Sequence, residues 1–436
     1  MKVIVHRGGQ QVGGTIIEIS TDNCKVFLDL GSSLYGSKSC ELSRSKVRQL
    51  TRDADAIFYS HSHTDHMGLF HLVPENVPQY IGSASRDLLL HTYTALDRHI
   101  DKEESLSVLK RMRTYRVGTL IDVASKGEII ITPYLVSHSA YDSYMLKVEV
   151  GRVKLLYIGD FRQHGYLGKG LMTTLKKYIG EVDLLIIEGT LFGRRDERPL
   201  HESVVKTNIS HTLMQHKYVF ALCSSTHADR LASFHEACRQ TGRLFLVDSY
   251  LRGVMEILTQ YGGKYSALYR FDRFFELINY KAPRVQRKLR REGFLMPIRA
   301  SMIDKVRGML KLYNDEEPWL IYSMWRGYLT KGAKYGSEGL AGITALFGEH
   351  ILEGTKDGLH TSGHADISTL EKVCNAVHPR CGIIPIHKEP DTQLESLSAL
   401  CSYRILRVGD WEIGDITILY VKVEMVRPLH GKRSLV

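Results

Sequence analysis

One short run constrains this chain more than any other: residues 59–68 read YSHSHTDHMG directly after an apolar stretch typical of a buried strand. Because alternate residues of an extended chain point the same way, His61 and His63 are expected to face one point. Asp65 and His66 follow where the chain turns, and they can face a second point close by. Imidazole nitrogen and carboxylate oxygen are ligands for zinc and similar ions. The run therefore predicts a metal site; the alternative is a polar loop with chance histidines.

Length and composition place this site in a multidomain protein with a basic surface. The 436 residues suggest two to three domains. No apolar run approaches the roughly 20 residues of a membrane helix, and the first residues are expected to form a strand rather than a signal peptide. The seven cysteines are scattered without a CxxC pair, which fits a reducing, cytoplasmic setting and argues against a cysteine-built metal site. A net charge of +10 suits a polyanionic partner such as nucleic acid, although a merely basic protein is equally compatible.

Polar residues also follow other apolar runs that we expect to be strands. An aspartate at such a strand end can be a simple turn residue, or it can orient a metal-bound histidine. Where several strands end at one sheet edge, their polar residues can form an active site. The residues that follow apolar runs in this way are Asp29, His138, Asp160, Glu188, His364 and His387.

The pattern of expected elements changes along the chain. Residues 83–100 and 103–115 are expected to be helical. From about residue 196, helices and strands alternate in a βαβ rhythm that predicts a doubly wound parallel sheet. The earlier pattern returns after Glu353. We therefore expect a first domain whose two parts are residues 1–195 and 356–436, with residues 196–355 inserted between them.

Two further stretches are candidates for nucleic-acid contact. Ser224–Thr226 lie between an expected strand and helix, where they either hold a phosphate or simply cap the helix. In residues 281–291, four basic residues share one helical face, which either contacts RNA or is only solvated. These four residues are Arg284, Arg287, Lys288 and Arg291.

Taken together, these motifs resemble the metallo-β-lactamase superfamily and, within it, the β-CASP nuclease branch. The superfamily signs are Asp29, the HSHTDH run, His138 and Asp160, in that order. The β-CASP signs are the acid at Glu188, the histidines of HTSGHAD and PIHKE, and the inserted helix–strand region. SGHA, together with a histidine at position 387, resembles ribonuclease J-type enzymes. PIHKE replaces the more usual PIHGE, and the loop after Tyr322 departs from the glycine- and serine-rich form. We expect no counterpart of the extra C-terminal domain of long bacterial members.

The resemblance implies a four-layer αβ/βα sandwich with an inserted β-CASP domain, and two Zn²⁺ per chain, for which Mn²⁺ or Mg²⁺ are alternatives. It implies one ion on His61, His63 and His138, and a second on Asp65, His66 and His387, with Asp160 bridging. Asp29 would support the ligands from behind. Glu188 would orient the site near Asp65 or the nucleophile. His364 would contact the scissile phosphate, with Ser362 beside it as a candidate RNA contact. Asp65, Asp160, Glu188 and His364 are the expected catalytic residues.

The activity implied is a zinc-dependent ribonuclease that hydrolyses single-stranded RNA by a two-metal mechanism and leaves a 5′-phosphate, with the exo- or endonucleolytic mode open. A homodimer is also left open, and no membrane partner is expected. A DNA nuclease of the same branch is the nearest alternative, but its members typically carry an apolar residue at the position of His387. A small-molecule hydrolase and a non-catalytic RNA-binding subunit are the others. The inserted basic region disfavours the former and the complete ligand set disfavours the latter.

Overall fold

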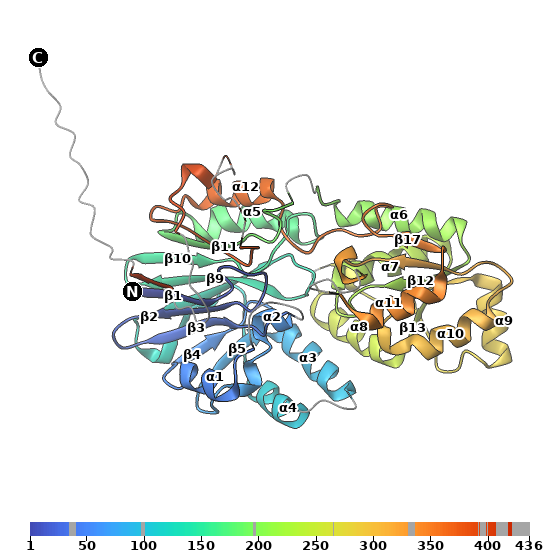
Figure 1. Ribbon diagram of the computed structural model, residues 1–436, viewed down its shortest axis with the longest axis horizontal. Coiled ribbons are helices and arrows are strands. Elements are labelled where there is room, and N and C mark those ends of the chain that lie inside the picture. Colours follow the sequence, from blue (N-terminus) through green and yellow to red (C-terminus); the bar gives the residue numbers. More distant parts are fainter. Residues whose placement is uncertain are drawn as a thin grey trace, which may run out of the picture.

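The computed structural model describes residues 1–34, 41–96, 101–194, 198–264, 266–329, 336–390, 392, 398, 400–406 and the strand at 417–420. These residues form a mixed α/β structure with three sheets (Figure 1). Two of the sheets lie together at one end of the long axis, and the third forms a separate unit at the other end. The mixed α/β fold with an additional α/β unit, predicted from the sequence, is confirmed.

The first sheet has seven strands in the order β19-β1-β2-β3-β4-β5-β6. Their sequences alternate or run apolar, and the buried side chains face both sides of the sheet. The strands are β1 (Lys2–Arg7), β2 (Ile16–Ser20), β3 (Lys25–Leu30), β4 (Ala56–Phe58), β5 (Gln79–Gly82), β6 (Arg113–Tyr115) and β19 (Thr417–Tyr420). The helices packed on its outer face are α1 (Arg44–Thr51), α2 (Thr64–Met67), α3 (Ser83–Ala95) and α4 (Lys102–Arg111).

The second sheet has six strands in the order β18-β11-β10-β9-β8-β7 and packs face to face on the first. A continuous apolar core between the two sheets contains side chains such as Leu28, Phe58, Leu155 and Ile186. The strands are β7 (Ile121–Asp122), β8 (Ile130–Val136), β9 (Ser143–Val150), β10 (Val153–Tyr157), β11 (Leu184–Glu188) and β18 (Gly382–Ile386). The short helix α5 (Leu171–Thr174) and α12 (Ile367–Val377) cover its outer face.

The third sheet, in the order β14-β13-β15-β12-β16-β17, has only parallel pairings in the described residues. Apolar clusters on both of its faces pack against helices, as the βαβ rhythm predicts. The strands are β12 (Tyr218–Leu222), β13 (Leu244–Val247), β14 (Phe275–Glu276), β15 (Phe294–Ile298), β16 (Trp319–Tyr322) and β17 (Ile351–Glu353). The helices are α6 (Glu202–Gln215), α7 (Ala228–Thr241), α8 (Ser249–Tyr261), α9 (Pro283–Glu292), α10 (Ile303–Leu312) and α11 (Glu338–Thr344).

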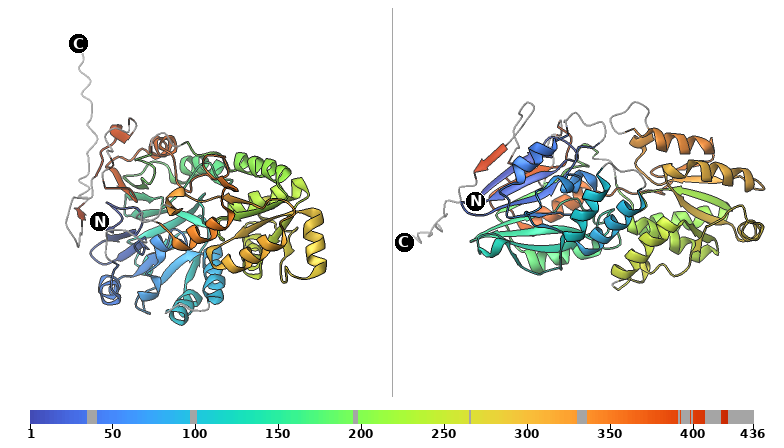
Figure 2. Two further views of the ribbon diagram at one scale, coloured as in Figure 1. Left: turned by 45° about the vertical axis from the view of Figure 1, so that its right-hand side comes forward. Right: turned by 90° about the horizontal axis from the view of Figure 1, so that it is seen from below.

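The third-sheet unit lies between two neighbouring strands of the second sheet in the sequence. β11 precedes it and β18 follows it, and these two strands pair in parallel from Leu184 to Glu188. The two-sheet unit therefore contains chain segments from before and after the inserted third-sheet unit. The third sheet lies beside it (Figure 2). The predicted boundaries at residues 195/196 and 355/356 stay predictions.

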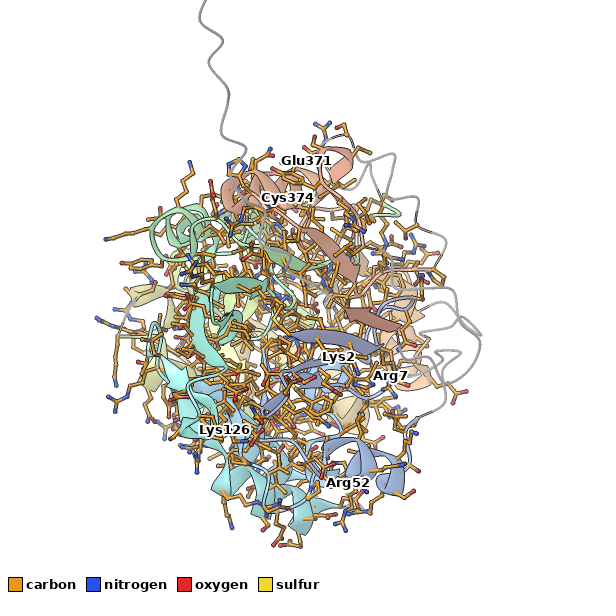
Figure 3. All side chains as sticks on the ribbon, turned by 90° about the vertical axis from the view of Figure 1, so that its left-hand side faces the viewer. Lys2, Arg7, Arg52, Lys126, Glu371 and Cys374 are labelled. Atoms are coloured by element: carbon orange, nitrogen blue, oxygen red, sulfur yellow. The ribbon has the colours of Figure 1, made fainter. Side chains whose placement is uncertain are left out.

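Basic side chains are not confined to the third-sheet unit. Figure 3 looks onto the opposite end of the molecule, where Lys2, Arg52 and Lys126 are spread over the two-sheet unit. Within the described residues, no helix combines the length and apolar character needed to cross a bilayer.

Candidate metal centre

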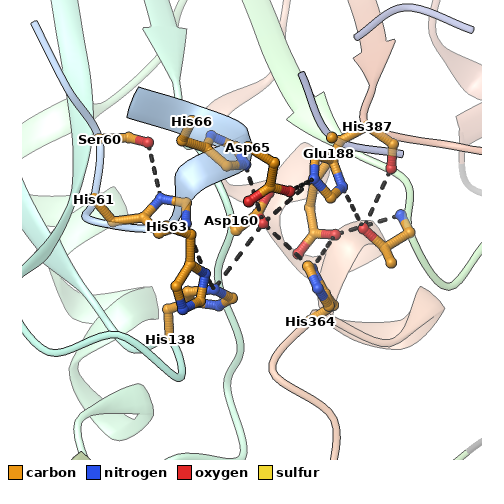
Figure 4. A network of polar contacts seen from close by, with 12 residues as sticks. Ser60, His61, His63, Asp65, His66, His138, Asp160, Glu188, His364 and His387 are labelled. Atoms are coloured by element: carbon orange, nitrogen blue, oxygen red, sulfur yellow. Dashed lines mark hydrogen bonds and ion pairs between the residues drawn. The ribbon is translucent and has the colours of Figure 1, made fainter. Parts of the chain in front are cut away.

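Most of the candidate ligands lie at strand ends that meet at one edge of the two-sheet unit, and Asp65 and His66 lie on α2 beside them (Figure 4). β3 and β4 are parallel neighbours in the first sheet, and β10, β11 and β18 are parallel neighbours in the second. Their carboxyl ends therefore meet at one side of the unit, which is where α/β sheets commonly place ligands. The residues in the last positions of these strands and of β8, or just after them, are Asp29, His61, His138, Asp160, Glu188 and His387.

A first cluster consists of three imidazoles. The Nε2 atom of His61 lies 3.1 Å from Nδ1 of His63, which lies 3.2 Å from Nε2 of His138. Four ligands around zinc at about 2.0–2.1 Å are separated from one another by roughly 3.3 Å, so these distances fit one tetrahedral ion. The remote ring nitrogens are also held in place. Nδ1 of His61 lies 3.0 Å from the Ser60 hydroxyl, and Nδ1 of His138 lies 2.7 Å from the carbonyl oxygen of Gly363.

A second cluster consists of Asp65, His66 and His387, all buried. The Oδ2 atom of Asp65 lies 3.1 Å from Nε2 of His387. The other nitrogen of His387, Nδ1, lies 2.8 Å from the Thr190 hydroxyl, which also donates to the His387 carbonyl oxygen at 3.2 Å. The Thr190 hydroxyl can accept from Nδ1–H and donate to the carbonyl together, and this leaves Nε2 free to bind a cation.

Asp160 lies between the two clusters. Its Oδ2 atom is 3.2 Å from Nε2 of His66, 3.6 Å from Nε2 of His387 and 4.0 Å from Nε2 of His138. Nε2 of His66 and Oδ1 of Asp160 are both buried without a hydrogen-bond partner in the described residues. Buried polar atoms normally have partners, and a cation would satisfy both of these. The residues therefore fit two ions that share the Asp160 carboxylate.

The electrostatics of the clusters also suit cations. Burial lowers the pKa of His61 and of His138 well below the usual range, which keeps both rings in the neutral form that metals require. Burial opposes ionisation of Asp65, but the neighbouring His387 and His66 imidazoles outweigh it and lower the pKa of Asp65 below its usual range. Burial similarly opposes a charged His66, yet the Asp160 and Asp29 carboxylates raise the pKa of His66 well above its usual range. Positive charge at this point is thus favoured.

Asp29 contacts the candidate ligand His66 on the side of the ring that faces away from Asp160. It accepts hydrogen bonds from the Ser60 amide at 2.6 Å and the Ser60 hydroxyl at 2.7 Å, and from the Tyr157 hydroxyl. Its Oδ2 atom also lies 2.7 Å from Nδ1 of His66, so it directs the opposite nitrogen of that ring toward Asp160. Asp29 has a φ of 61°, a left-handed conformation that aspartate tolerates better than most residues. This placement fits the orienting position predicted for Asp29.

Glu188 holds His364. Its Oε2 atom lies 3.0 Å from Nδ1 of His364, and its Oε1 atom accepts from the amides of Phe161 and Ala365 at 3.3 Å each. The resemblance implies that Glu188 orients the site near Asp65 or the nucleophile. In the structure the Glu188 carboxylate contacts His364 and lies within 4.8 Å of the candidate ligand atoms of Asp160 and His387. Burial disfavours a charged ring, but the Glu188 and Asp160 carboxylates outweigh it and raise the pKa of His364 to about 9. The His364 side chain is 22% exposed, so this cation borders the open side of the site.

The candidate RNA-contact residues lie in two places. The Ser362 hydroxyl accepts from the His364 amide at 3.1 Å, beside the clusters. The basic face of α9 lies at the far end of the third-sheet unit, and the structure does not bring it to the clusters. Among the four residues of that face, Lys288 and Arg291 pair with Glu292, whereas Arg284 and Arg287 are exposed and unpaired within the described residues.

A cavity of about 350 Å³ lies beside His63. One wall is a face of α3 with Leu88, Leu89 and Tyr93, and the other includes Ser224–Thr226 and Tyr250 of the third-sheet unit. Ser224–Thr226 do not cap α7. His227 does so, because its Nδ1 accepts from the Arg230 amide at 3.2 Å.

Sequence reasoning missed several supporting residues. Thr190 lies two residues beyond Glu188, so the polar residues after β11 were a usable signal. Ser60 immediately precedes the first histidine. Tyr157 and Arg162 gave no signal, because their partners come from remote segments.

Comparison with known proteins agrees with this geometry. A family model described as a beta-lactamase superfamily domain matches residues 26–235. An RNase J-like protein of Methanocaldococcus jannaschii is 25% identical over 208 residues, which cover 46% of this chain and 45% of the relative. The probable RNase MJ4 of the same organism is 37% identical over 75 residues, or 16% of this chain and 17% of that protein. The chain thus matches less than half the length of these curated relatives.

Among solved structures, a protein of unknown function from Enterococcus faecalis V583 has a similar fold. Its TM-score is 0.68 at 17% identity, and the match covers 96% of this chain and 99% of that one. This likeness extends over both units but concerns the fold alone. From the matched domain and the buried histidine and aspartate clusters, we conclude that the chain carries a metallo-β-lactamase superfamily domain with the site of a metal-dependent hydrolase, and that it is a distant homologue of the RNase J-like protein and the probable RNase MJ4.

Proposed function

We propose that this protein is a zinc-dependent ribonuclease of the β-CASP type, with the third-sheet unit as its β-CASP domain. The observation that carries the proposal is the position of the Asp160 carboxylate between two ligand clusters, with the cationic His364 at their open side. Two ions held in this way supply, when bound, a nucleophile at neutral pH and positive charge for the oxygens of an in-line displacement. A phosphodiester is the substrate class that uses both contributions.

The residues of the chain have distinct tasks in this proposal. Asp160, with the two clusters, holds the reacting centre. His364 donates a proton or a hydrogen bond to a phosphate or leaving-group oxygen, and Glu188 keeps the ring charged and oriented. Groups of this kind typically contribute about 10²–10⁴-fold to the rate.

Three further observations support RNA as the substrate. Relatives matching part of the chain carry ribonuclease names, and His387 stands where DNA-directed enzymes of the branch typically have an apolar residue. The described residues that line the cavity beside His63 combine aromatic rings, hydroxyls and aliphatic side chains, and none of them is Asp, Glu, Lys or Arg. Such a lining suits a base stacked next to the scissile bond.

The test compares end-labelled RNA with single-stranded DNA of the same sequence, using zinc-loaded protein. RNA carrying a 5′-monophosphate and RNA carrying a 5′-triphosphate are both included, because a difference would reveal a 5′-end-dependent mode. We expect RNA to be cleaved in preference to DNA and the downstream product to carry a 5′-phosphate. Preferential DNA cleavage would select the DNA nuclease, and no cleavage of either would contradict the proposal.

Two variants separate the metal clusters from His364. His63→Ala should lose metal and activity together. His364→Ala should keep both metal equivalents, because Glu188 rather than a cluster residue holds its Nδ1, while turnover falls by about 10²–10⁴-fold. Elemental analysis gives the metal content of each. Loss of one equivalent in His364→Ala would make this histidine a ligand instead.

A further inference from the structure

A buried arginine holds the backbone next to His364. The carbonyl oxygen of Ser362, two residues before His364, accepts from Nη1 of Arg162 at 3.1 Å and lies 2.7 Å from Nε2 of His164. Two side-chain donors therefore converge on one carbonyl. Both come from the loop after β10, the same loop that carries Asp160.

The next carbonyl, that of Gly363, lies 2.7 Å from Nδ1 of His138, a member of the three-histidine cluster. A Cβ atom at Gly363 would come within 3.2 Å of the His138 ring, so backbone and imidazole are in close contact. A shift of the Ser362 backbone would thus affect His364 and His138 together. It would displace His364 on one side, and it would change the hydrogen bond that orients His138 on the other.

Arg162 is itself held by carboxylates of the third-sheet unit. Its Nη2 atom donates to Oδ2 of Asp229 on α7 at 2.7 Å, and Nη1 lies 3.4 Å from Oε2 of Glu202 on α6. Glu202 also accepts from Nε of Arg230 at 2.7 Å. Arg230 in turn donates to the carbonyl oxygen of Leu359, at the start of the segment that returns to His364.

These charges are enclosed. The side chains of Arg162, Arg230 and Glu202 are 0% exposed, and Asp229 is 5% exposed. Burial opposes ionisation of Glu202, but Arg230 and Arg162 outweigh it and lower the pKa of Glu202 far below its usual range. The network therefore consists of two guanidinium groups in direct contact with two carboxyl groups.

We propose that Arg162 is a positioning residue, which sets the Ser362–His364 backbone against the metal clusters and makes that setting depend on docked α6 and α7. A buried ion network is no better for stability than well-packed apolar side chains of the same volume. What distinguishes this network is that its hydrogen bonds have fixed directions. The planar guanidinium reaches Ser362, Asp229 and Glu202 from two nitrogens in a fixed fork, whereas a lysine carries its three donors on a single rotating nitrogen.

The experiment uses the full-length protein loaded with Co²⁺, whose visible absorption depends on the geometry of its ligands. Arg162→Lys keeps the buried charge and removes the fork. His164→Ala is a milder second variant, because it removes the other donor to the Ser362 carbonyl without leaving a charge unpaired. Burial lowers the pKa of His164 to about 4, so the lost side chain is neutral. Arg243→Lys is the matched control. Arg243 also donates to two carbonyls, of Leu213 and Glu292, but it lies in the third-sheet unit away from the clusters.

We expect Arg162→Lys and His164→Ala to bind two equivalents of Co²⁺ with altered absorption bands, and Arg243→Lys to match the wild type. For RNA cleavage, which rests on the proposed function, kcat should fall by about 10- to 100-fold in Arg162→Lys. KM should change little, because the backbone shift affects the reacting centre rather than RNA retention.

Wild-type bands and wild-type kcat in both folded variants would overturn the proposal. If Arg162→Lys does not fold, His164→Ala alone decides by the same criteria. If the wild-type protein does not cleave RNA, the proposed function fails, and the absorption bands still decide whether Arg162 positions the centre.

Discussion

A single oxygen atom, Oδ2 of Asp160, is within 4.0 Å of imidazole nitrogens of His66 on α2, His138 after β8 and His387 after β18. The orientation of the imidazoles around it follows from side chains that do not face the centre. Ser60, Asp29 and Thr190 each bond the remote nitrogen of one histidine, so the near nitrogens converge. At the scale of the residue, the site is therefore built as much by these supporting hydrogen bonds as by the candidate ligands.

The Thr190 hydroxyl offers a direct test of this support. Thr190→Val keeps the shape of the side chain but removes the partner of Nδ1 of His387. The His387 ring then loses its fixed orientation, and affinity for the second metal equivalent should fall by about 10- to 100-fold. Competition with a chelating indicator measures this affinity. Thr190→Ser, which retains the hydroxyl, is the matched control and should stay near the wild type. Equal affinity in the valine variant would show that Thr190 does not orient the ligand.

Asp142 offers a test away from the clusters. It accepts from the amides of Ala84 and Ser85 at the start of α3, and from the Tyr144 hydroxyl. Burial outweighs these bonds and raises the pKa of Asp142 from 3.8 to about 6. The folded state thus holds this proton more tightly than the unfolded state. The resulting stabilisation is fully present below pH 3.8 and is lost as the pH rises through 6.

Asp142→Asn should remove this pH dependence, since an amide does not titrate. The amide oxygen can still accept from the α3 amides, and asparagine tolerates the φ of 69° found at this position. The free energy of unfolding of the variant, relative to the wild type, should rise by up to about 3 kcal/mol between pH 4 and 7. Urea unfolding at several pH values measures the difference. A difference that stays level over this range would contradict the assignment.

At the scale of the element, local pattern and tertiary context disagree in one instructive place. Residues 103–115 were expected to be one helix, but α4 ends at Arg111 and residues 113–115 form β6. β6 pairs in parallel with β5, from Tyr80 to Gly82, and extends the first sheet by one strand. The Tyr115 ring also packs against Tyr144 of the second sheet. The helix prediction was wrong here because an available sheet edge outweighed local helix propensity.

The exposed part of the α9 face yields a prediction about long RNA. Arg284 and Arg287 are unpaired within the described residues, so they can contact phosphates without breaking an ion pair. Changing both to alanine should reduce the slope of log affinity against log salt by roughly 1.4, which corresponds to two single-strand contacts. Cleavage of a dinucleotide should not change, because α9 lies far from the clusters.

A filter-binding salt titration of long single-stranded RNA measures this slope. Arg239→Ala is the control, because Arg239 lies on another helix of the same unit and is already paired with Glu236. An unchanged slope in the double variant would assign the α9 face to solvation alone.

At the scale of the whole molecule, the candidate site joins segments from both sides of the inserted unit. His61 follows β4 in the first sheet, and His387 follows β18 in the second, so most of the chain separates them in sequence. β18 pairs directly with β11, which precedes the inserted unit, and this pairing returns the chain to the site. The inserted unit also contacts the first sheet's helices. The His91 ring on α3 stacks on Tyr250 of α8 with centroids 5.1 Å apart. Ions bound at the clusters would therefore tie the last part of the chain to the first.

Metal removal should consequently loosen one specific region. We expect chelation to lower the melting temperature and to speed amide hydrogen exchange in β18, whose end carries His387. Exchange in β12, at the centre of the third sheet, is the internal control and should change little. Hydrogen exchange followed by mass spectrometry, with and without added zinc, resolves the two strands. Equal protection of β18 in both conditions would show that the ions do not hold this end of the chain.

The sequence alone was sufficient to predict a mixed α/β protein with an additional α/β unit, and to single out the histidines and acids that the structure gathers. The physical reason is that strand periodicity, the βαβ rhythm and the crowding of ligand-type residues at strand ends are all local properties. Only the tertiary structure decided that Glu188 holds His364, that Thr190 holds His387, and that Arg162 links Ser362 to Asp229 and Glu202. These contacts join residues separated by up to 200 positions, and their partners are determined by sheet order and by the docking of the third-sheet unit, which local pattern does not encode.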